Sequence, residues 1–289
     1  MRFYPRLPAI LVLAAWPAAA SAQFIDPFTT IDAAWTANRY APAGFSSVVF
    51  DGDHRLKLTL DASGAAANRP PAFSSVFYNT QGMQRPGGVT GAWTISAEVF
   101  IPAAFNTVTG PLVASEVWGH TGTTPGGGNY LIFGFTNASR TDPLNPTAVD
   151  RGFRFQAYDG NTGTWLDLGV PGGFVFDSWH VLTGASTGTV FEYRLNGVLL
   201  LSNPTAAGSD LLSAMIQGYN FGEATGYSVH WDNLATSAIP EPSTSALLVA
   251  LAALGVAAHR RHRAAAILAK QGADIGDDLR PKTGSNFSV

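Results

Sequence analysis

The chain has 289 residues and no cysteine, which excludes disulfides and thiolate metal sites. Its 17 lysines and arginines are outnumbered by 20 aspartates and glutamates. Between Gln23 and Ala238 sixteen acidic residues stand against nine basic ones, which excludes a nucleic-acid-binding protein because such a protein needs a basic surface.

The first 22 residues have the three parts of a secretory signal peptide. Arg2 and Arg6 give a positive start, residues 9–16 are apolar, and Ala20-Ser21-Ala22 forms a small-residue cleavage site. The apolar run is too short for a stable membrane span. The sequence therefore predicts an exported protein whose mature chain begins at Gln23.

Residues 23–238 contain short strand patterns separated by Gly, Pro, Asn and Asp, and no amphipathic helix of useful length. The longest pattern is Trp93–Ile101, in which every second residue is apolar, and Pro102 ends it. Further strands are predicted at 47–50, 55–60, 74–78, 112–118, 130–135, 153–158, 165–168, 179–183, 190–195, 198–201, 215–219 and 227–234. We predict an all-β, single-domain sandwich of two antiparallel sheets, because each strand must bury its apolar face against another sheet.

Two hairpins can be placed within this pattern. Asn196-Gly197 separates two strands and accepts the positive φ angles of a type I′ turn. Residues 159–163, Asp-Gly-Asn-Thr-Gly, join the strand at 153–158 to the one at 165–168. Their alternating oxygens are similar to those of a Ca²⁺ loop, but the later bidentate glutamate is missing, so a hairpin explains the segment better.

The order of three segments resembles the concanavalin A-like lectin and glucanase superfamily, in its laminin-G-like branch. The segments are Trp179-His180-Val181-Leu182, the strand pair Val190–Leu199 with its Asn-Gly turn, and the closing strand Val229–Leu234. The resemblance implies a jelly-roll sandwich over residues 23–238, with one concave face that is a common glycan site in that superfamily. It does not imply catalysis.

Glycoside hydrolysis would need a pair of carboxylates on the predicted strands. Retaining glycoside hydrolases need two carboxylates about 5–5.5 Å apart, and acids at i and i+2 on one strand share a face. Neither Glu98 nor Glu116 has an acid two residues away, and the glucanase pattern E-x-D-x-x-E is absent. A meeting of Glu98 and Glu116 across neighbouring strands stays open. We predict that the protein is not an enzyme.

Metal and ligand sites are predicted from carboxylates and aromatic residues. Asp51, Asp53 and Asp232 form a candidate Ca²⁺ site, because the first and last strands of the sandwich are expected to be neighbours. Sugars stack on aromatic rings while their hydroxyls find polar groups, and the polar loop Gly119–Asn129 is long enough to border such a site. The candidate ligand-binding residues are Trp118, His120, Tyr130, Tyr158, Trp165 and Trp231.

The C-terminal segment, residues 239–263, has the parts of a sorting signal. Pro240-Glu241-Pro242 is followed by an uncharged apolar helix predicted at 245–258 and by the basic cluster 259–263, which contains Arg260, Arg261 and Arg263. The apolar run within it, 246–258, has thirteen residues, fewer than the roughly 20 of a standard span, and a buried core helix is the alternative. The lack of any polar stripe favours a short transmembrane helix with its arginines on the cytoplasmic side.

This three-part order resembles the PEP-CTERM sorting signal of Gram-negative bacteria that make extracellular polysaccharide. The resemblance implies a membrane-embedded exosortase as partner, with cleavage near Pro240-Glu241-Pro242 and delivery to the cell surface or matrix. A tail of unassigned role, residues 264–289, follows the arginines.

Together these patterns predict an exported, non-catalytic protein that binds glycan or associates with exopolysaccharide. Two alternatives remain: a hydrolase or lyase acting on polysaccharide, and a structural envelope or biofilm protein without a specific ligand.

Overall fold

The computed structural model describes residues 22–61, 63, 71, 80–124, 127–139, 150–204, 210–219, 226–239, 251–261 and 263. Both sheets belong to one compact unit, Ala20–Ile239. The C-terminal segment falls in a second unit and is described separately.

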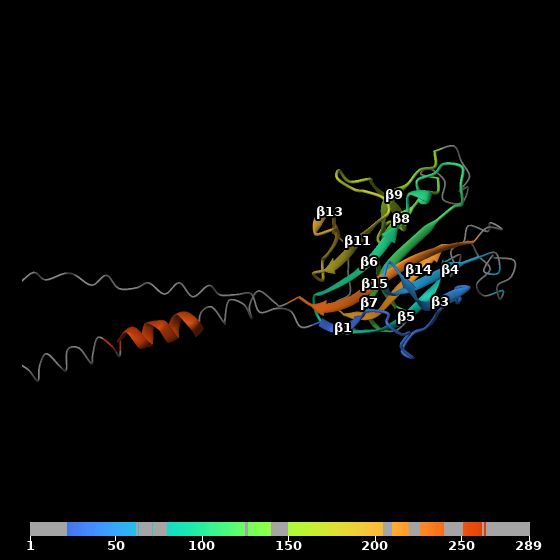
Figure 1. Cartoon of the computed structure of the whole chain (residues 1–289). Coiled ribbons are helices and arrows are strands. Elements are labelled where there is room, and N and C mark those ends of the chain that lie inside the picture. The colour runs from blue at the N-terminus through green and yellow to red at the C-terminus, as the bar shows by residue number, and fades with distance from the viewer. Residues whose placement is uncertain are drawn as a thin grey trace, which may run out of the picture. The chain divides into compact units, whose positions relative to one another are not determined.

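Two antiparallel sheets form the compact unit, as predicted (Figure 1). Sheet A has the order β13 (Val198–Pro204), β12 (Val190–Leu195), β11 (Ser178–Ser186), β6 (Trp93–Ile101), β15 (Tyr227–Ala238), β4 (Asp53–Leu60) and β3 (Gly44–Phe50), and β1 (Ala22–Asp26) also pairs with β15. Sheet B has the order β10 (Thr164–Gly169), β9 (Arg154–Asp159), β8 (Gly127–Thr136), β7 (Ala114–Thr124), β14 (Leu211–Tyr219), β5 (Thr80–Val89) and β2 (Thr36–Asn38). A 3-10 turn, η5 (Ala103–Phe105), follows β6. The fold class is therefore confirmed.

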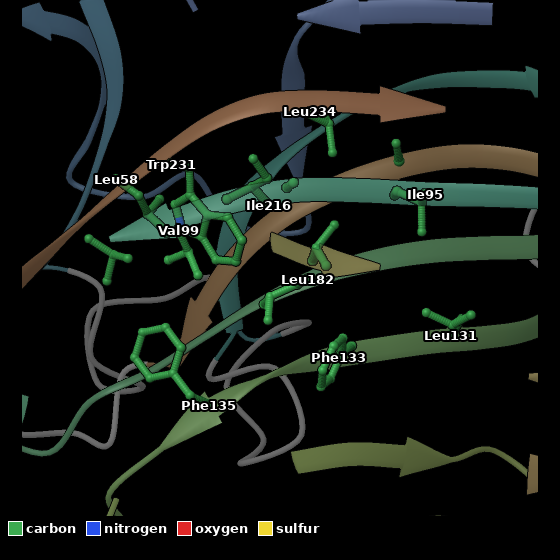
Figure 2. Close-up of a cluster of buried hydrophobic side chains, with 14 of the residues drawn as sticks. Leu58, Ile95, Val99, Leu131, Phe133, Phe135, Leu182, Ile216, Trp231 and Leu234 are labelled. Carbon is green, nitrogen blue, oxygen red and sulfur yellow. The ribbon is translucent and has the colours of Figure 1, made fainter. Parts of the chain in front are cut away.

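The core lies between the two sheets. On β6 the apolar positions from Trp93 to Ile101 are at most 1% exposed, and the intervening residues are more accessible. Figure 2 shows Leu58, Val99 and Trp231 of sheet A packed with side chains of sheet B such as Ile216 and Phe133. Alternation with period two thus places one face of every central strand in this layer.

The Asn196-Gly197 hairpin has the predicted turn. Both residues have positive φ angles, 50° and 81°, and Leu195 pairs with Val198 across the turn. At the other hairpin, between β9 and β10, the Asp159 carboxylate accepts hydrogen bonds from the Asn161 backbone nitrogen and the Thr162 hydroxyl. These local bonds explain Asp159 as a turn residue.

The prediction of a loop at Gly119–Asn129 is wrong for most of these residues. β7 continues to Thr124 and β8 begins at Gly127, so the two strands form a long hairpin. The ladder extends through the pair His120 and Tyr130. Gly119 is a packing position, because a β-carbon there would lie 2.5 Å from the Trp93 ring.

Three strands were not predicted, namely β1, β2 and β5. β5 contains Gly82, Pro86, Gly87 and Gly88, residues that ordinarily indicate a loop. At Gly87 a β-carbon would lie 2.6 Å from Leu211 Cγ, so this glycine also permits close packing. The predicted strand at 74–78 lies outside the described residues.

The predicted signal peptide also lies outside the described residues, apart from Ala22, which begins β1. In the C-terminal unit residues 251–261 and 263 are helical, so the helix includes Arg260 and Arg261. Within the described ranges, no helix is both long and apolar enough to cross a membrane.

Candidate functional site

The outer face of sheet B, the face that points away from sheet A, carries the candidate site. On β7 Val117 joins the core between the sheets, and strand alternation places Glu116, Trp118 and His120 on the opposite face. The pairings of β7 with β14 and β8 extend this face to both sides.

A row of seven residues crosses the outer face at the level of Glu116. Each member pairs with the next across neighbouring strands, in the order Asn38, Gly82, Gln217, Glu116, Gly134, Gln156 and Asp167. We call this set the polar row. It contains three amides, two carboxyl groups and two glycines.

Glu116 occupies the middle of the polar row and is 1% exposed. Trp118 Nε1 donates to Glu116 Oε2 at 3.2 Å, and Gln156 Nε2 donates to Oε1 at 3.1 Å. Burial raises the pKa of Glu116 from 4.5 to about 7, and the two hydrogen bonds offset only part of that increase. Within the described part of the chain Glu116 forms no ion pair with a cation.

The two glycines of the polar row let these long side chains lie flat on the sheet. A β-carbon at Gly134 would lie 2.6 Å from Glu116 Cγ, and one at Gly82 would lie 2.7 Å from Gln217 Cγ. Any larger residue would displace the carboxyl or the amide from its position.

Three amides form a hydrogen-bonded chain beside Glu116. Gln217 Nε2 donates to Asn38 Oδ1 at 3.0 Å, and Asn38 Nδ2 donates to Gln84 Oε1 at 2.7 Å. Gln217 is 0% exposed, and among the described residues no group donates to its Oε1 atom.

Aromatic side chains lie next to the polar row. Trp118 packs with Ile132 and Met215, and Tyr130 and Tyr158 pack against this cluster. His120 stacks on Tyr130 with ring centroids 4.7 Å apart. We call the following set the aromatic row: Trp118, His120, Tyr130, Tyr158 and Trp165.

Solvent reaches one end of the aromatic row. Trp165 is 37% exposed and makes an edge contact with Tyr158, with ring centroids 5.4 Å apart. Trp118 is only 4% exposed, and the Arg39 guanidinium lies over its ring at 5.6 Å. Trp165 is therefore the most accessible ring of the aromatic row, and Tyr158 and Tyr130 are partly exposed.

The structure brings five of the six predicted ligand residues together on this face: Trp118, His120, Tyr130, Tyr158 and Trp165. Trp231 is a correction. Its side chain is 0% exposed, and its Nε1 donates to Ser115 Oγ at 3.1 Å. Trp231 is buried because it lies on the face of β15 that points into the core between the sheets. A ligand on the outer surface cannot contact it.

Sequence reasoning missed the amides of the polar row. Gln156 lies on the same face of β9 as Tyr158, and Gln217 lies on the same face of β14 as Met215. A polar residue at such positions in an otherwise buried strand was the available signal. Its meaning depends on pairings between strands far apart in the sequence.

The candidate metal residues lie near one another, as expected for neighbouring first and last strands, but a guanidinium lies among them. Arg55 forms ion pairs with both Asp53 and Asp232. Asp51 accepts a hydrogen bond from Trp179 Nε1 at 3.1 Å. Among the residues described, no three His, Cys, Asp or Glu side chains are grouped so that they could hold a metal ion.

Glu98 and Glu116 do not meet, which corrects the alternative left open above. Glu98 lies on β6 in sheet A, opposite Asp232, whereas Glu116 lies on β7 in sheet B. Both point away from the core, so they are on opposite sides of the sandwich. Asp167 is three strand spacings from Glu116, about 14 Å, which exceeds the separations used by glycoside hydrolases.

A search of known families identifies the PEP-CTERM protein-sorting motif at residues 238–261. No curated protein sequence matches the chain significantly.

Three solved structures with a similar fold show the range of the structural matches. A protein described as a Bacteroides ovatus mixed linkage glucan GH16 in complex with a product has a TM-score of 0.50 and 11% identity, covering 74% of this chain and 98% of that chain. A cellulose induced protein has a TM-score of 0.49 and 12% identity, covering 75% and 98%. A sialidase has a TM-score of 0.43 and 9% identity, covering 71% of this chain but 17% of that chain. These identities show the fold alone. The chain thus combines a β-sandwich of the concanavalin A-like glucanase and lectin type with a C-terminal PEP-CTERM sorting motif.

Proposed function

We propose that this exported protein binds a glycan on the outer face of sheet B without cleaving it. The observation that carries the proposal is the aromatic row beside the polar row on one sheet face. Aromatic rings offer apolar surfaces for stacking on sugar rings, and amide and carboxyl groups satisfy the hydroxyls. The partly exposed Tyr158–Trp165 pair is the surface on which a sugar ring would stack first.

The non-catalytic part of the proposal rests on carboxylate spacing. The other acid of the polar row, Asp167, is about 14 Å from Glu116, which is farther than the separation that retaining or inverting hydrolysis requires. Both oxygens of Glu116 also accept hydrogen bonds from neighbouring side chains.

The PEP-CTERM motif implies export and sorting by an exosortase-type system. We extend this to delivery at the cell surface or extracellular matrix of a Gram-negative bacterium, with a transient membrane anchor formed by the C-terminal apolar helix. Replacing Pro240-Glu241-Pro242 by alanines is expected to block processing. An unchanged mature size and surface location would contradict this part.

Glycan binding is tested with the full-length chain on an array of neutral and charged polysaccharides. We expect Trp165→Ala to weaken binding about 5- to 30-fold, because one stacked ring contributes roughly 1–2 kcal/mol. Trp179→Ala is the matched control, since Trp179 is a partly buried tryptophan outside sheet B. No binding to any glycan at high protein concentration would leave the structural envelope protein as the better explanation.

One observation favours polysaccharide hydrolysis as a second candidate. A pKa of about 7 is what a general acid needs at neutral pH, and burial gives Glu116 that value. Release of reducing ends from a polysaccharide, abolished by Glu116→Gln but not by Glu98→Gln, would overturn the non-catalytic proposal.

A further inference from the structure

The last strand of the sandwich runs directly into the sorting motif. β15 ends at Ala238, where the residues matched to the motif begin. The backbone nitrogen of the next residue, Ile239, donates to the Ala92 carbonyl oxygen at 2.8 Å, and Ile239 is the last residue of the compact unit. Pro240 follows at once in the sequence. The chain therefore has no spacer between the folded unit and the tripeptide at which processing is expected.

The end of β15 is paired along both of its edges. Residues 235–238 pair with residues 93–96 of β6, and residues 234–237 pair with β1 on the other side. A strand between two neighbours has its backbone N–H and C=O groups engaged in the two ladders. Because a processing enzyme needs free, extended backbone around the bond that it cuts, residues 234–238 are not available to it while both ladders are intact.

Side chains hold the same segment in place. Leu234, labelled in Figure 2, and Thr236 are 0% exposed, and Leu234 belongs to the core between the sheets. On the outer face of sheet A the Ser237 hydroxyl lies 2.6 Å from the Thr94 hydroxyl, at hydrogen-bond distance. Peeling this end of β15 away from β6 and β1 therefore breaks ladder bonds and exposes a buried leucine, which makes the open state rare.

One side chain of sheet B holds β1 against the end of β15. The Arg85 guanidinium, on β5, lies 4.1 Å from the centre of the Phe24 ring and donates to Asp26 Oδ2 at 2.9 Å. Asp26 is 5% exposed and also accepts hydrogen bonds from Trp35 Nε1 at 2.8 Å and from the Phe28 backbone nitrogen at 3.0 Å. We call Phe24, Asp26, Trp35 and Arg85 the β1 clasp. It ties the N-terminal strand of sheet A to sheet B through charge-assisted hydrogen bonds.

Resting on the exosortase-type processing proposed above, we propose that the folded sandwich confines cleavage to the C-terminal side of Ile239 and that the β1 clasp enforces this limit. In the cleavage step the C–N bond of one peptide group breaks. Water adds its hydroxyl to the carbonyl carbon, and its remaining proton goes to the released amine. The mature protein then keeps the whole of β15, and sheet A keeps the ladders on both sides of that strand.

Protection of β15 is tested without any sorting enzyme. The full-length chain in detergent is treated with proteinase K, and the cut sites are mapped by mass spectrometry. We expect no cut at residues 234–239 of the wild-type protein. Arg85→Met removes the cation of the β1 clasp and should raise the rate of cutting there about tenfold, because the rate follows the population of the open state. Arg194→Met is the matched control, since it removes an ion pair with Glu192 on β12, away from β15.

A milder variant covers the case in which Arg85→Met does not fold. Phe24→Ala keeps the ion pair between Arg85 and Asp26 and removes only the ring under the guanidinium, so cutting at residues 234–239 should rise less than in Arg85→Met but above the control. Rapid cutting of the wild-type protein at residues 234–239 would overturn the proposal. Cutting of the clasp variants at the rate of Arg194→Met would do the same.

The limit on processing is tested in a Gram-negative host that produces an exosortase. We expect the mature protein to end at Ile239 or later, as measured by its intact mass. A short Gly-Ser linker inserted between Ile239 and Pro240 supplies free backbone and should shorten the half-life of the precursor severalfold. The same linker inserted after Gly172, where nothing lies within 4 Å of a β-carbon, is the control. A mature C-terminus upstream of Ile239 would refute the limit, and so would equal half-lives with and without the linker.

The outcomes separate this proposal from the sorting function. Processing that removes part of β15 would refute the limit and leave sorting by an exosortase standing. A wild-type precursor that is never processed in this host would refute the sorting function, while the proteinase K map still decides whether the β1 clasp protects the end of β15.

Discussion

The two outer faces of the sandwich hold their buried carboxyl groups in different ways. On sheet A, Asp232 is 0% exposed and is paired with the Arg55 guanidinium, which also lies over the Trp179 ring at 5.0 Å. On sheet B, Glu116 accepts hydrogen bonds from the Gln156 amide and the Trp118 indole N–H. Burial raises the pKa of both groups, but the charge of Arg55 offsets part of the increase at Asp232, whereas only uncharged donors offset it at Glu116.

The aromatic side chains on the outer faces of the two sheets also have different surroundings. On sheet A the β3–β4 hairpin brings Phe50 onto His230, with ring centroids 3.8 Å apart, and Phe100 and Trp179 pack against Phe50. These rings pack against one another. On sheet B the aromatic row ends in the exposed Trp165. The comparison indicates that these aromatic rings of sheet A pack on one another, whereas the aromatic row of sheet B ends in a partly exposed ring.

The largest effect is expected from breaking the flat surface of sheet B. Gly134→Ala places a β-carbon in contact with Glu116 Cγ and with backbone atoms of β7. We expect a loss of more than about 4 kcal/mol in the free energy of unfolding, measured by urea denaturation. Gly172→Ala is the control, since nothing lies within 4 Å of a β-carbon there. Equal stability of the two variants would show that the polar row tolerates displacement.

Removing the guanidinium from sheet A makes Asp232 similar to Glu116. Arg55→Met leaves a buried carboxylate without its cation, at an expected cost of about 4 kcal/mol at pH 7. Loss of Arg55 also removes a group that lowers the Asp232 pKa, so the deficit should shrink as the pH falls. A variant with wild-type stability at pH 7 would contradict the role assigned to this pair.

The pH dependence of stability sharpens the comparison on sheet B. Because the folded pKa of Glu116, about 7, is above its unfolded value, the folded state binds more protons between pH 4.5 and 7. Stability is therefore lost as the pH rises through this window, by about 3 kcal/mol for this one group. Denaturation of the wild-type protein and of Glu116→Gln at several pH values measures the difference.

The stability curve of Glu116→Gln against pH has to be subtracted from that of the wild-type protein, because two histidines change the stability in the opposite direction. Burial lowers the pKa values of His180 and His230, so their contribution to stability rises with pH over an overlapping range. A difference curve that is flat from pH 4.5 to 8 would contradict a neutral Glu116.

The smallest effect is expected for Glu98→Gln. Glu98 is partly exposed on sheet A and raises the pKa of Asp232 through its charge. Its removal should change stability by less than about 0.5 kcal/mol, and any change at pH 7 should be stabilising. A loss above 1 kcal/mol in thermal or urea denaturation would mean that Glu98 has a partner role comparable to that of Arg55.

Much of the fold could be predicted because local pattern and final structure agree. Trp93–Ile101 alternates cleanly and forms β6 within the predicted bounds, and Asn196-Gly197 forms the predicted turn. β5 could not be predicted, because its glycines favour a loop locally and are required only by side chains of other strands.

The aromatic residues of the candidate site could be predicted from the sequence, but its polar residues could not. Trp118 and Tyr130 were selected as ring-bearing side chains on strands, which needs no knowledge of neighbours. The environment of Glu116 depends on Gln156 and Gln217, which become its neighbours only through strand pairing. Trp231 was assigned to the wrong side because the parity of the closing strand can be read only once its pairing is known.

The position of β15 in sheet A has a consequence for the order of folding during export. β15 is the last strand before the sorting motif, yet it lies between β6 and β4 and also pairs with β1, which lies beside it in Figure 1. Sheet A therefore has a gap at its centre until residues 227–238 have been translocated. The sandwich can therefore be completed only when the strand that directly precedes the sorting motif is available for pairing.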